Sequence, residues 1–300
     1  MPDNPTKPKK RILALSGGGM RGVILAQFLE LIERDSGRRI QDIFDLVAGT
    51  STGAITAATL GAPNPMPAAQ LKDFYYKSGP KIFRKVLGGI WNSGLFAPKY
   101  HAEPLESELQ ASIGDYTLDQ CPIKLLIPTY EATRRDAVFI KSWDAYWHLF
   151  PAWQAARCSS AAETYFPPFA IGARQYIDGG NIANNPALCA SFEAFRLWPN
   201  ADLSVTLIGT GQCARPRPLP TGGEIEWAPQ IFGAFSSGQD DMAEYMCNGL
   251  IEPGYSYQRL DVLMDEVPAM DDAGTRTLDH YCDLARAKWE HVGKDIIANL

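Results

Sequence analysis

The apolar positions of the first 60 residues fall into short runs and helical stripes that alternate along the chain. Residues 11–16 and 44–48 are short apolar runs, typical of strands buried on both faces. Between them, residues 23–35 place apolar side chains at helical spacing opposite a polar face, and Gly37 is a natural helix stop. Small residues at 54–60 predict a second helix. Two successive strand–turn–helix units predict a parallel sheet covered by helices.

Beyond residue 60 the pattern predicts more strands and then a change to helix. A loop rich in proline and glycine at residues 216–223 precedes a mostly helical region, whose last helix carries one apolar stripe at residues 278–296. We therefore expect a disordered lead-in at residues 1–9 and one domain at residues 10–300, with residues 220–300 as a mostly helical C-terminal part. The other predicted elements are strands at residues 123–128, 137–142, 176–177 and 203–209, and a helix at residues 152–162.

Composition narrows the class of protein without defining it. The chain has 300 residues, 46% of them hydrophobic and 21% charged, which is ordinary for a globular protein. No run approaches the roughly 20 apolar residues of a membrane-spanning helix, and residues 1–10 lack the apolar core of a signal peptide. The net charge of -6 argues against a nucleic-acid polymer as partner. The six cysteines have no C-x-x-C spacing, so we expect free thiols and no metal site.

A glycine-flanked serine follows the second predicted strand. Gly49-Thr50-Ser51-Thr52-Gly53 matches G-x-S-x-G, a sharp strand-to-helix turn that lifts a serine hydroxyl clear of the backbone. The two glycines avoid collisions with the strand and the helix, and the helix directs its free N–H groups toward the serine. Ser51 is therefore a candidate nucleophile. A tight turn that merely contains a serine is the alternative.

A second glycine-rich turn, Gly17-Gly18-Gly19-Met20-Arg21-Gly22, directly follows the first predicted strand. Its backbone N–H groups can converge on an anion, which in acyl transfer is the tetrahedral oxyanion. Arg21 would add positive charge or hold the loop. The same residues also spell the G-x-G-x-x-G of a dinucleotide-binding turn. That alternative expects an acidic residue at the tip of the second strand, where this chain runs into the serine turn instead.

The candidate base is a carboxylate. Asp178 ends a short predicted strand, where α/β sheets place reactive groups, and Gly179 and Gly180 let the backbone pass close to another loop. A carboxylate within hydrogen-bond reach of a serine can itself accept the proton. An ordinary Asp-Gly turn is the alternative. None of the four histidines lies beside a glycine turn or at a predicted strand end, so none is a candidate base. They are His101, His148, His280 and His291.

Three blocks in this order resemble the patatin-like phospholipases. They are the glycine turn at residues 17–22, the serine turn at residues 49–53, and Asp178-Gly179-Gly180. Residues 156–168 are also similar to the segment that precedes the aspartate in that family. The resemblance covers about residues 10–210, and no motif covers the last 90 residues.

The resemblance implies a three-layer α/β fold with a mostly parallel central sheet flanked by helices and a helical C-terminal part. It implies a serine hydrolase of the phospholipase A type that cleaves ester bonds of membrane phospholipids through a Ser-Asp dyad, without a metal or other cofactor. Ser16 departs from the family, which often has aspartate there, but it lies outside the dyad. The implied site residues are Ser51 as nucleophile, Asp178 as base, Gly17, Gly18 and Gly19 as oxyanion donors, and Arg21, Gly49, Gly53, Gly179 and Gly180 as supports.

The chain is also similar to patatin-like effectors of bacterial antiviral defence that a cyclic nucleotide switches on. That branch implies a cyclic dinucleotide as activator, with Arg134, Arg135, Arg215 and Arg217 as candidate phosphate contacts. We expect a cytoplasmic protein that acts at the inner membrane surface, with its oligomeric state left open. A binding module with an inactive site on the same fold is a further alternative.

Basic and aromatic residues are interleaved between residues 74 and 102, where no acidic residue occurs. This composition suits the surface of an anionic bilayer, and Gly88, Gly89 and Gly94 would let the segment move as a lid. The alternative is that the aromatic residues pack a helix onto the core. The basic residues are Lys77, Lys81, Arg84, Lys85 and Lys99, and the aromatic residues are Tyr75, Tyr76, Phe83, Trp91, Phe96 and Tyr100.

Overall fold

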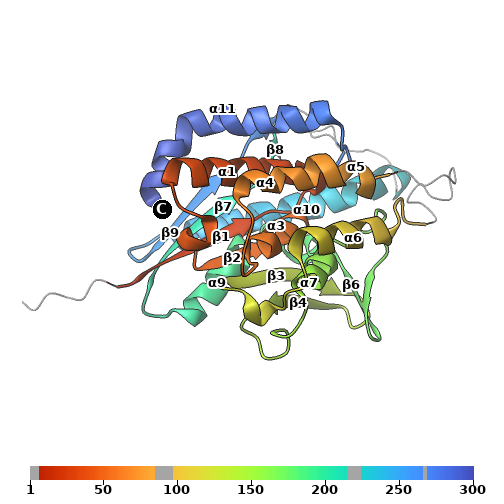
Figure 1. Cartoon of the computed structure of the whole chain (residues 1–300), viewed down its shortest axis with the longest axis horizontal. Coiled ribbons are helices and arrows are strands. Elements are labelled where there is room, and N and C mark those ends of the chain that lie inside the picture. Colours follow the sequence, from red (N-terminus) through yellow and green to blue (C-terminus); the bar gives the residue numbers. More distant parts are fainter. Residues whose placement is uncertain (1–6, 85–96, 215–223, 266–268) are drawn as a thin grey trace, which may run out of the picture.

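The computed structural model describes residues 7–84, 97–214, 224–265 and 269–300, with the side chains of residues 224–232 excepted. A mixed sheet runs through the middle of the molecule in the order β5-β6-β3-β2-β1-β7-β9, with β4 paired to β3 (Figure 1). Five strands run parallel: β1 (Lys9–Leu15), β2 (Leu46–Gly49), β3 (Lys124–Glu131), β7 (Asp202–Ile208) and β9 (Tyr255–Leu260). The antiparallel strands are β4 (Asp136–Lys141), β5 (Phe169–Ile171) and β6 (Arg174–Ile177).

Helices cover both faces of this sheet. Alternate residues of β1 point to opposite sides, so that Leu13 and Leu15 enter one apolar core while Ile12 and Ala14 enter the other. This is the predicted three-layer arrangement, and it is confirmed. The helices of the larger core are α1 (Val23–Ser36), α3 (Thr52–Leu60), α4 (Ala68–Asp73), α6 (Ala102–Ile113), α7 (Ala152–Ser159) and α11 (Thr275–Asn299), and those of the smaller core are α9 (Ala187–Leu197) and α10 (Glu224–Gly249).

Several element ends follow the sequence pattern closely. Helix α1 ends at Gly37, whose φ of 65° is a left-handed conformation that glycine adopts without strain. The apolar stripe of α11 is buried, and this helix lies along α1 (Figure 1). The remaining short elements are η1 (Gly19–Gly22), α2 (Ile40–Ile43), η2 (Phe74–Ser78), α5 (Gly79–Ile82), η4 (Leu118–Gln120), β8 (Gln212–Cys213), α8 (Gly180–Ala183) and β10 (Leu263–Met264).

The prediction of a mostly helical C-terminal part missed β9. This strand pairs in parallel with β7 and lies between the two long helices α10 and α11 in the chain. Its sequence, Tyr-Ser-Tyr-Gln-Arg-Leu, holds too few apolar residues to stand out as a buried run. The strand is possible because Arg259, near its end, is neutralised by carboxylates from α10 and from Asp261.

Within the described ranges, no helix is long and apolar enough to cross a membrane. The same residues contain no group of three or more His, Cys, Asp or Glu side chains that could hold a metal ion. All six cysteines lie in the described chain, where no disulfide joins them to one another.

Candidate active site

Ser51 occupies a strained turn between β2 and α3. Its backbone has φ 54° and ψ -119°, a region that residues other than glycine rarely enter. A Cβ on Gly49 would lie 2.1 Å from the Gly53 carbonyl oxygen, and one on Gly53 would lie 2.2 Å from the Leu15 carbonyl oxygen. Both glycines are therefore required by close backbone approach, as the G-x-S-x-G pattern predicts.

The pairing of strands, which the sequence did not reveal, brings Asp178 close to this turn. Strands β2 and β6 use the same edge of β3, β2 pairing at residues 124–126 and β6 at residues 130–131. Strand β2 is parallel to β3 and β6 is antiparallel, so the two chains approach each other along that edge. The expectation that Asp178 ends a strand is correct. This strand is antiparallel to β3 and is not one of the five parallel strands.

The Asp178 carboxyl group is buried, with 3% of the residue exposed. Its Oδ1 accepts a 2.7 Å hydrogen bond from the Gly180 N–H, while its Oδ2 has no hydrogen-bond partner in the described part of the chain. Burial, helped by the nearby Glu163 carboxylate, raises the pKa of Asp178 to about 7, and hydrogen bonding to the Gly180 N–H and the Ser51 hydroxyl opposes this rise. A carboxyl group of this pKa can exchange a proton with the serine near neutral pH.

The glycine turn lies against the serine turn. A Cβ on Gly17 would be 3.3 Å from the Ser51 Cβ. The structure contradicts one predicted oxyanion donor, because the Gly17 N–H is already donated to the Asn184 carbonyl at 3.1 Å. No hydrogen bond joins the N–H groups of Gly18 and Gly19 to other described residues, and both glycines line the same cavity as Ser51. These two amides are the candidate oxyanion donors.

An apolar cavity opens beside Ser51 and Asp178. Side chains from α3, η2, α5 and α6 form its walls, and the cavity also receives Met20 and Met270. Such a lining suits a hydrocarbon chain next to the serine hydroxyl. The apolar lining side chains are Met20, Ile55, Phe74, Tyr75, Ile82, Phe83, Leu105, Tyr165, Phe166 and Met270.

The predicted supporting residues contact the glycine turn and the Asp178 turn. Arg21 donates from Nε to the Gly18 carbonyl and from a terminal nitrogen to the Gly211 carbonyl, each at 3.3 Å, so it holds the glycine turn. A Cβ on Gly179 would lie 2.2 Å from the Pro128 carbonyl oxygen, which explains the first glycine after Asp178. Gly180 supplies the N–H that Asp178 accepts.

Sequence reasoning missed a serine that joins the two halves of the site. Ser159 accepts a 2.9 Å hydrogen bond from the Ser51 N–H at its Oγ and donates one of 2.6 Å to the Pro128 carbonyl. Its own carbonyl accepts the Gly179 N–H at 3.1 Å. Ser159 lies in the segment at residues 156–168 that resembles the family, and that resemblance was the available signal.

The four histidines all lie in the described chain, and none lines the cavity. Three of them are exposed and His148 is half-buried, with its Nδ1 next to the Ala145 carbonyl oxygen. The geometry therefore agrees with an aspartate, and not a histidine, beside the serine.

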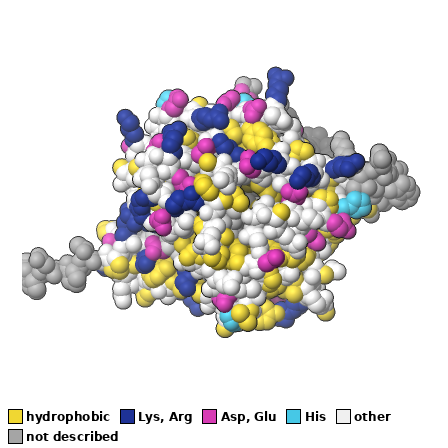
Figure 2. All heavy atoms as spheres, viewed as in Figure 1, with side chains coloured by type: hydrophobic (Ala, Val, Ile, Leu, Met, Phe, Trp, Pro, Cys, Tyr) yellow, Lys and Arg dark blue, Asp and Glu magenta, His cyan; other side chains and the backbone are white. Residues whose placement is uncertain are grey.

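The described residues of the basic and aromatic segment, 74–84 and 97–102, include several that pack onto the protein. Tyr75 and Tyr100 are buried in the core, as the packing alternative expects. Lys77 pairs with Asp73 at 2.8 Å and Lys81 with Glu108 at 2.7 Å, both carboxylates from outside the segment. Acidic and basic side chains are interspersed on the face shown in Figure 2. The predicted residues Lys85, Gly88, Gly89, Trp91, Gly94 and Phe96 lie outside the described residues.

Ser51 in its strained turn, the buried Asp178 carboxyl group and an apolar cavity thus lie together in one α/β domain. The family model of the patatin-like phospholipases matches residues 13–190, more than half of the chain. The chain belongs to the patatin-like phospholipase family, and this membership supports lipid ester hydrolysis as its activity.

Named relatives and one solved structure are similar to this chain, and the first of them agrees with this assignment. Patatin-like protein 2 of Arabidopsis thaliana is 30% identical over 93% of this chain and 83% of the relative. The human calcium-independent phospholipase A2-gamma is 28% identical over 90% of this chain, which spans 37% of that longer protein. The crystal structure of VipD from Legionella pneumophila matches 95% of this chain and 67% of that chain, with a TM-score of 0.44 and 13% identity.

Proposed function

We propose that this protein is a phospholipase A type acyl hydrolase in which Ser51 is the nucleophile and Asp178 its base. One observation carries the proposal. A buried carboxylate with a pKa of about 7 and an unpartnered Oδ2 lies beside a strained serine at the end of an apolar cavity. A buried carboxylate oxygen without a partner costs stability, which indicates a role beyond folding.

The reaction follows from this arrangement. The Ser51 Oγ attacks the ester carbonyl carbon and its proton passes to the Asp178 Oδ2. The carbonyl oxygen becomes an oxyanion that the Gly18 and Gly19 N–H groups stabilise. Collapse of this intermediate breaks the ester bond, and the departing alkoxide takes the proton from Asp178. Water then gives a proton to Asp178 and attacks the acyl carbon. The bond from this carbon to the Ser51 Oγ breaks, the fatty acid leaves, and the Ser51 Oγ takes the proton back from Asp178.

The proposed substrate is a membrane phospholipid whose acyl chain enters the apolar cavity. The proposed place of reaction is the cytoplasmic side of the inner membrane, where the protein would bind peripherally.

Hydrolysis of mixed phospholipid vesicles by the wild type and by Ser51→Ala tests the proposal. We expect free fatty acid and lysophospholipid from the wild type and neither from Ser51→Ala. A fluorophosphonate probe should label the wild type and not Ser51→Ala. Labelling that persists in Ser51→Ala would assign the nucleophile to another residue, and a wild type that takes no label would favour a binding module on the same fold.

The activity should depend on pH through Asp178. The base must be ionised, and its pKa is raised from 3.8 to about 7, so kcat/KM is expected to rise with pH through about 7 and to level off above it. Because the Glu163 carboxylate helps to raise this pKa, Glu163→Gln should move the midpoint of the rise to lower pH. The measurement is kcat/KM for a soluble p-nitrophenyl ester from about pH 5 to about pH 9. A midpoint near that of an exposed aspartate would contradict the assignment.

Activation by a cyclic dinucleotide stays a prediction. Of the candidate phosphate contacts, Arg134 lies 3.3 Å from Asp136, Arg135 is exposed, and Arg215 and Arg217 lie outside the described residues. A thermal-shift screen with cyclic dinucleotides is the test. A shift in Tm together with a rise in lipid hydrolysis would support the regulated branch, whereas a flat screen with constitutive hydrolysis would contradict it.

A further inference from the structure

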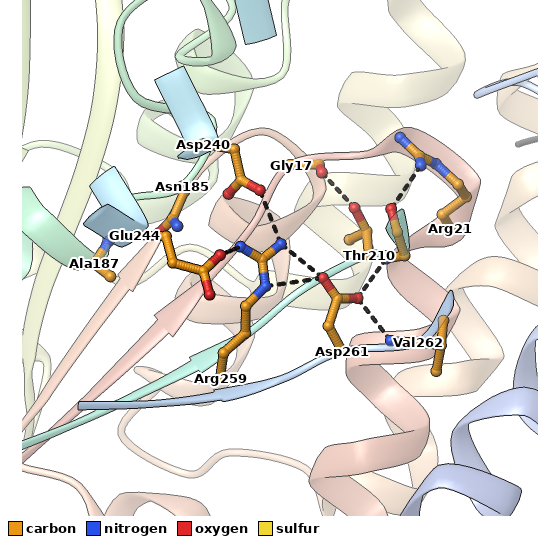
Figure 3. Close-up of polar contacts among 11 residues, drawn as sticks. Gly17, Arg21, Asn185, Ala187, Thr210, Asp240, Glu244, Arg259, Asp261 and Val262 are labelled. Atoms are coloured by element: carbon orange, nitrogen blue, oxygen red, sulfur yellow. Dashed lines mark hydrogen bonds and ion pairs between the residues drawn. The ribbon is translucent and has the colours of Figure 1, made fainter. Parts of the chain in front are cut away.

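Thr210 holds the carbonyl group next to a candidate oxyanion donor. This residue follows β7, is 5% exposed, and donates a 2.6 Å hydrogen bond from its hydroxyl to the Gly17 carbonyl oxygen (Figure 3). The Gly17 carbonyl and the Gly18 N–H belong to one planar trans peptide group and point in opposite directions. Fixing the carbonyl on one side therefore fixes the direction of the Gly18 N–H on the other.

The fit between Thr210 and the glycine turn is tight. A Cβ on Gly18 would lie 2.3 Å from the Thr210 Oγ and 2.7 Å from its Cβ. The next peptide is held in the same manner, since the Gly18 carbonyl accepts the Arg21 Nε at 3.3 Å and so directs the Gly19 N–H. Each candidate donor is thus oriented by a side chain that binds the carbonyl of its own peptide plane, and the Thr210 contact is the shorter of the two.

The loop that carries Thr210 is itself anchored. Asp261 accepts the Gly211 N–H at 2.8 Å and the Val262 N–H at 2.9 Å through Oδ1. Its Oδ2 lies 2.8 Å from Arg259, which also lies 2.8 Å from Asp240 of α10 (Figure 3). This network of buried and partly buried charges anchors the backbone directly after Thr210.

We propose that Thr210 is a positioning residue that orients the Gly18 N–H toward the oxyanion of the reaction proposed above, on which this inference rests. Thr210 does not line the cavity and acts through the peptide plane. An oxyanion donor matters in the transition state and not in the bound ester, so its misorientation lowers kcat and leaves KM nearly unchanged.

The test compares Thr210→Val with Thr210→Ser. Valine keeps the shape of threonine without the hydroxyl, and we expect kcat for a soluble p-nitrophenyl ester to fall by about 10- to 100-fold, short of the full loss of a donor. The KM should stay within about twofold. The rate constant for fluorophosphonate labelling of Ser51 should fall by a similar factor. Thr210→Ser keeps the hydroxyl and should restore most of both rates.

Thr206→Val is the matched control. Thr206 lies on β7, is 1% exposed, and accepts a 2.9 Å hydrogen bond from the Gln258 amide, remote from the glycine turn. This variant also removes a buried, hydrogen-bonded hydroxyl, so it should lower the free energy of unfolding about as much as Thr210→Val while kcat stays near the wild-type value.

The outcomes separate this inference from the proposed function. Thr210→Val with wild-type kcat, Thr210→Ser as slow as Thr210→Val, or an equal loss of kcat in Thr206→Val would each overturn the role of Thr210. A wild type that is labelled by fluorophosphonate but does not hydrolyse phospholipid would overturn the proposed function alone. The labelling rates of the Thr210 variants would still test the positioning role of Thr210. A wild type that takes no label would overturn both.

Discussion

Asp178→Asn is expected to lower kcat by at least about a thousandfold, nearly as far as Ser51→Ala. In the wild type, the Gly180 N–H donates a 2.7 Å hydrogen bond to Asp178 Oδ1. Asparagine keeps the shape of the side chain, and its amide oxygen can still accept this hydrogen bond. It cannot take the proton of Ser51. The measurement is kcat on phospholipid and on a soluble ester, with the fold of the variant checked by circular dichroism.

The histidines supply the controls for this prediction. If aspartate is the base, alanine in place of any one histidine should leave kcat within about twofold of the wild type. A collapse of activity in one of these variants, together with a mild effect of Asp178→Asn, would replace the dyad by a histidine-based mechanism. The variants are His101→Ala, His148→Ala, His280→Ala and His291→Ala.

Stability gives a second readout of the same substitution. The folded-state pKa of Asp178 is raised above the ordinary value, so folded protein holds the proton more tightly than unfolded protein. The contribution of Asp178 to stability therefore falls as pH rises from about 4 to about 7. Asp178→Asn removes this penalty, and the variant should gain in stability relative to the wild type on going from about pH 5 to about pH 8. Urea denaturation at both pH values measures this difference in the free energy of unfolding. A variant that instead loses stability relative to the wild type over this range would mean that burial does not raise the pKa of Asp178.

The parts of this site that depend on local sequence could be predicted, because the residues that a turn requires lie within that turn. Gly49 and Gly53 are needed by the turn that holds Ser51, and the pattern of glycines announces that turn. The same holds for Gly179, which must pass the Pro128 carbonyl. The three-layer fold follows likewise from the order of strands and helices.

The parts that depend on long-range pairing could not be predicted. The Gly17 N–H is engaged by Asn184, which lies 167 residues further along the chain (184 − 17), so the glycine turn alone gave one donor too many. Thr210 belongs to no motif recognised in the sequence, and the parallel pairing of β7 with β1 brings it to the Gly17 carbonyl. Strand β9 was missed for a similar reason, because the carboxylates that neutralise Arg259 come from other elements.

The Ser51 turn holds a backbone conformation that costs stability. With φ 54° and ψ -119°, the Ser51 backbone occupies a φ/ψ region that costs about 1–3 kcal/mol for a residue with a Cβ. Neighbouring backbone imposes this conformation, since the turn is closed by hydrogen bonds from the Gly53 and Ala54 N–H groups to the Thr50 and Ser51 carbonyls. The strain presents the hydroxyl to the cavity beside Asp178.

Ser51→Gly is therefore expected to abolish activity and yet to unfold at higher urea than Ser51→Ala. Both variants lack the nucleophile, but only glycine relieves the positive φ, and after its larger loss of chain entropy the net gain over alanine should be about 1 kcal/mol. The matched pair is Ser160→Gly and Ser160→Ala, at a buried serine with an ordinary φ of -106°. There glycine should be the less stable of the two. If the alanine variant were the more stable one at Ser51 as well as at Ser160, the Ser51 turn would store no strain.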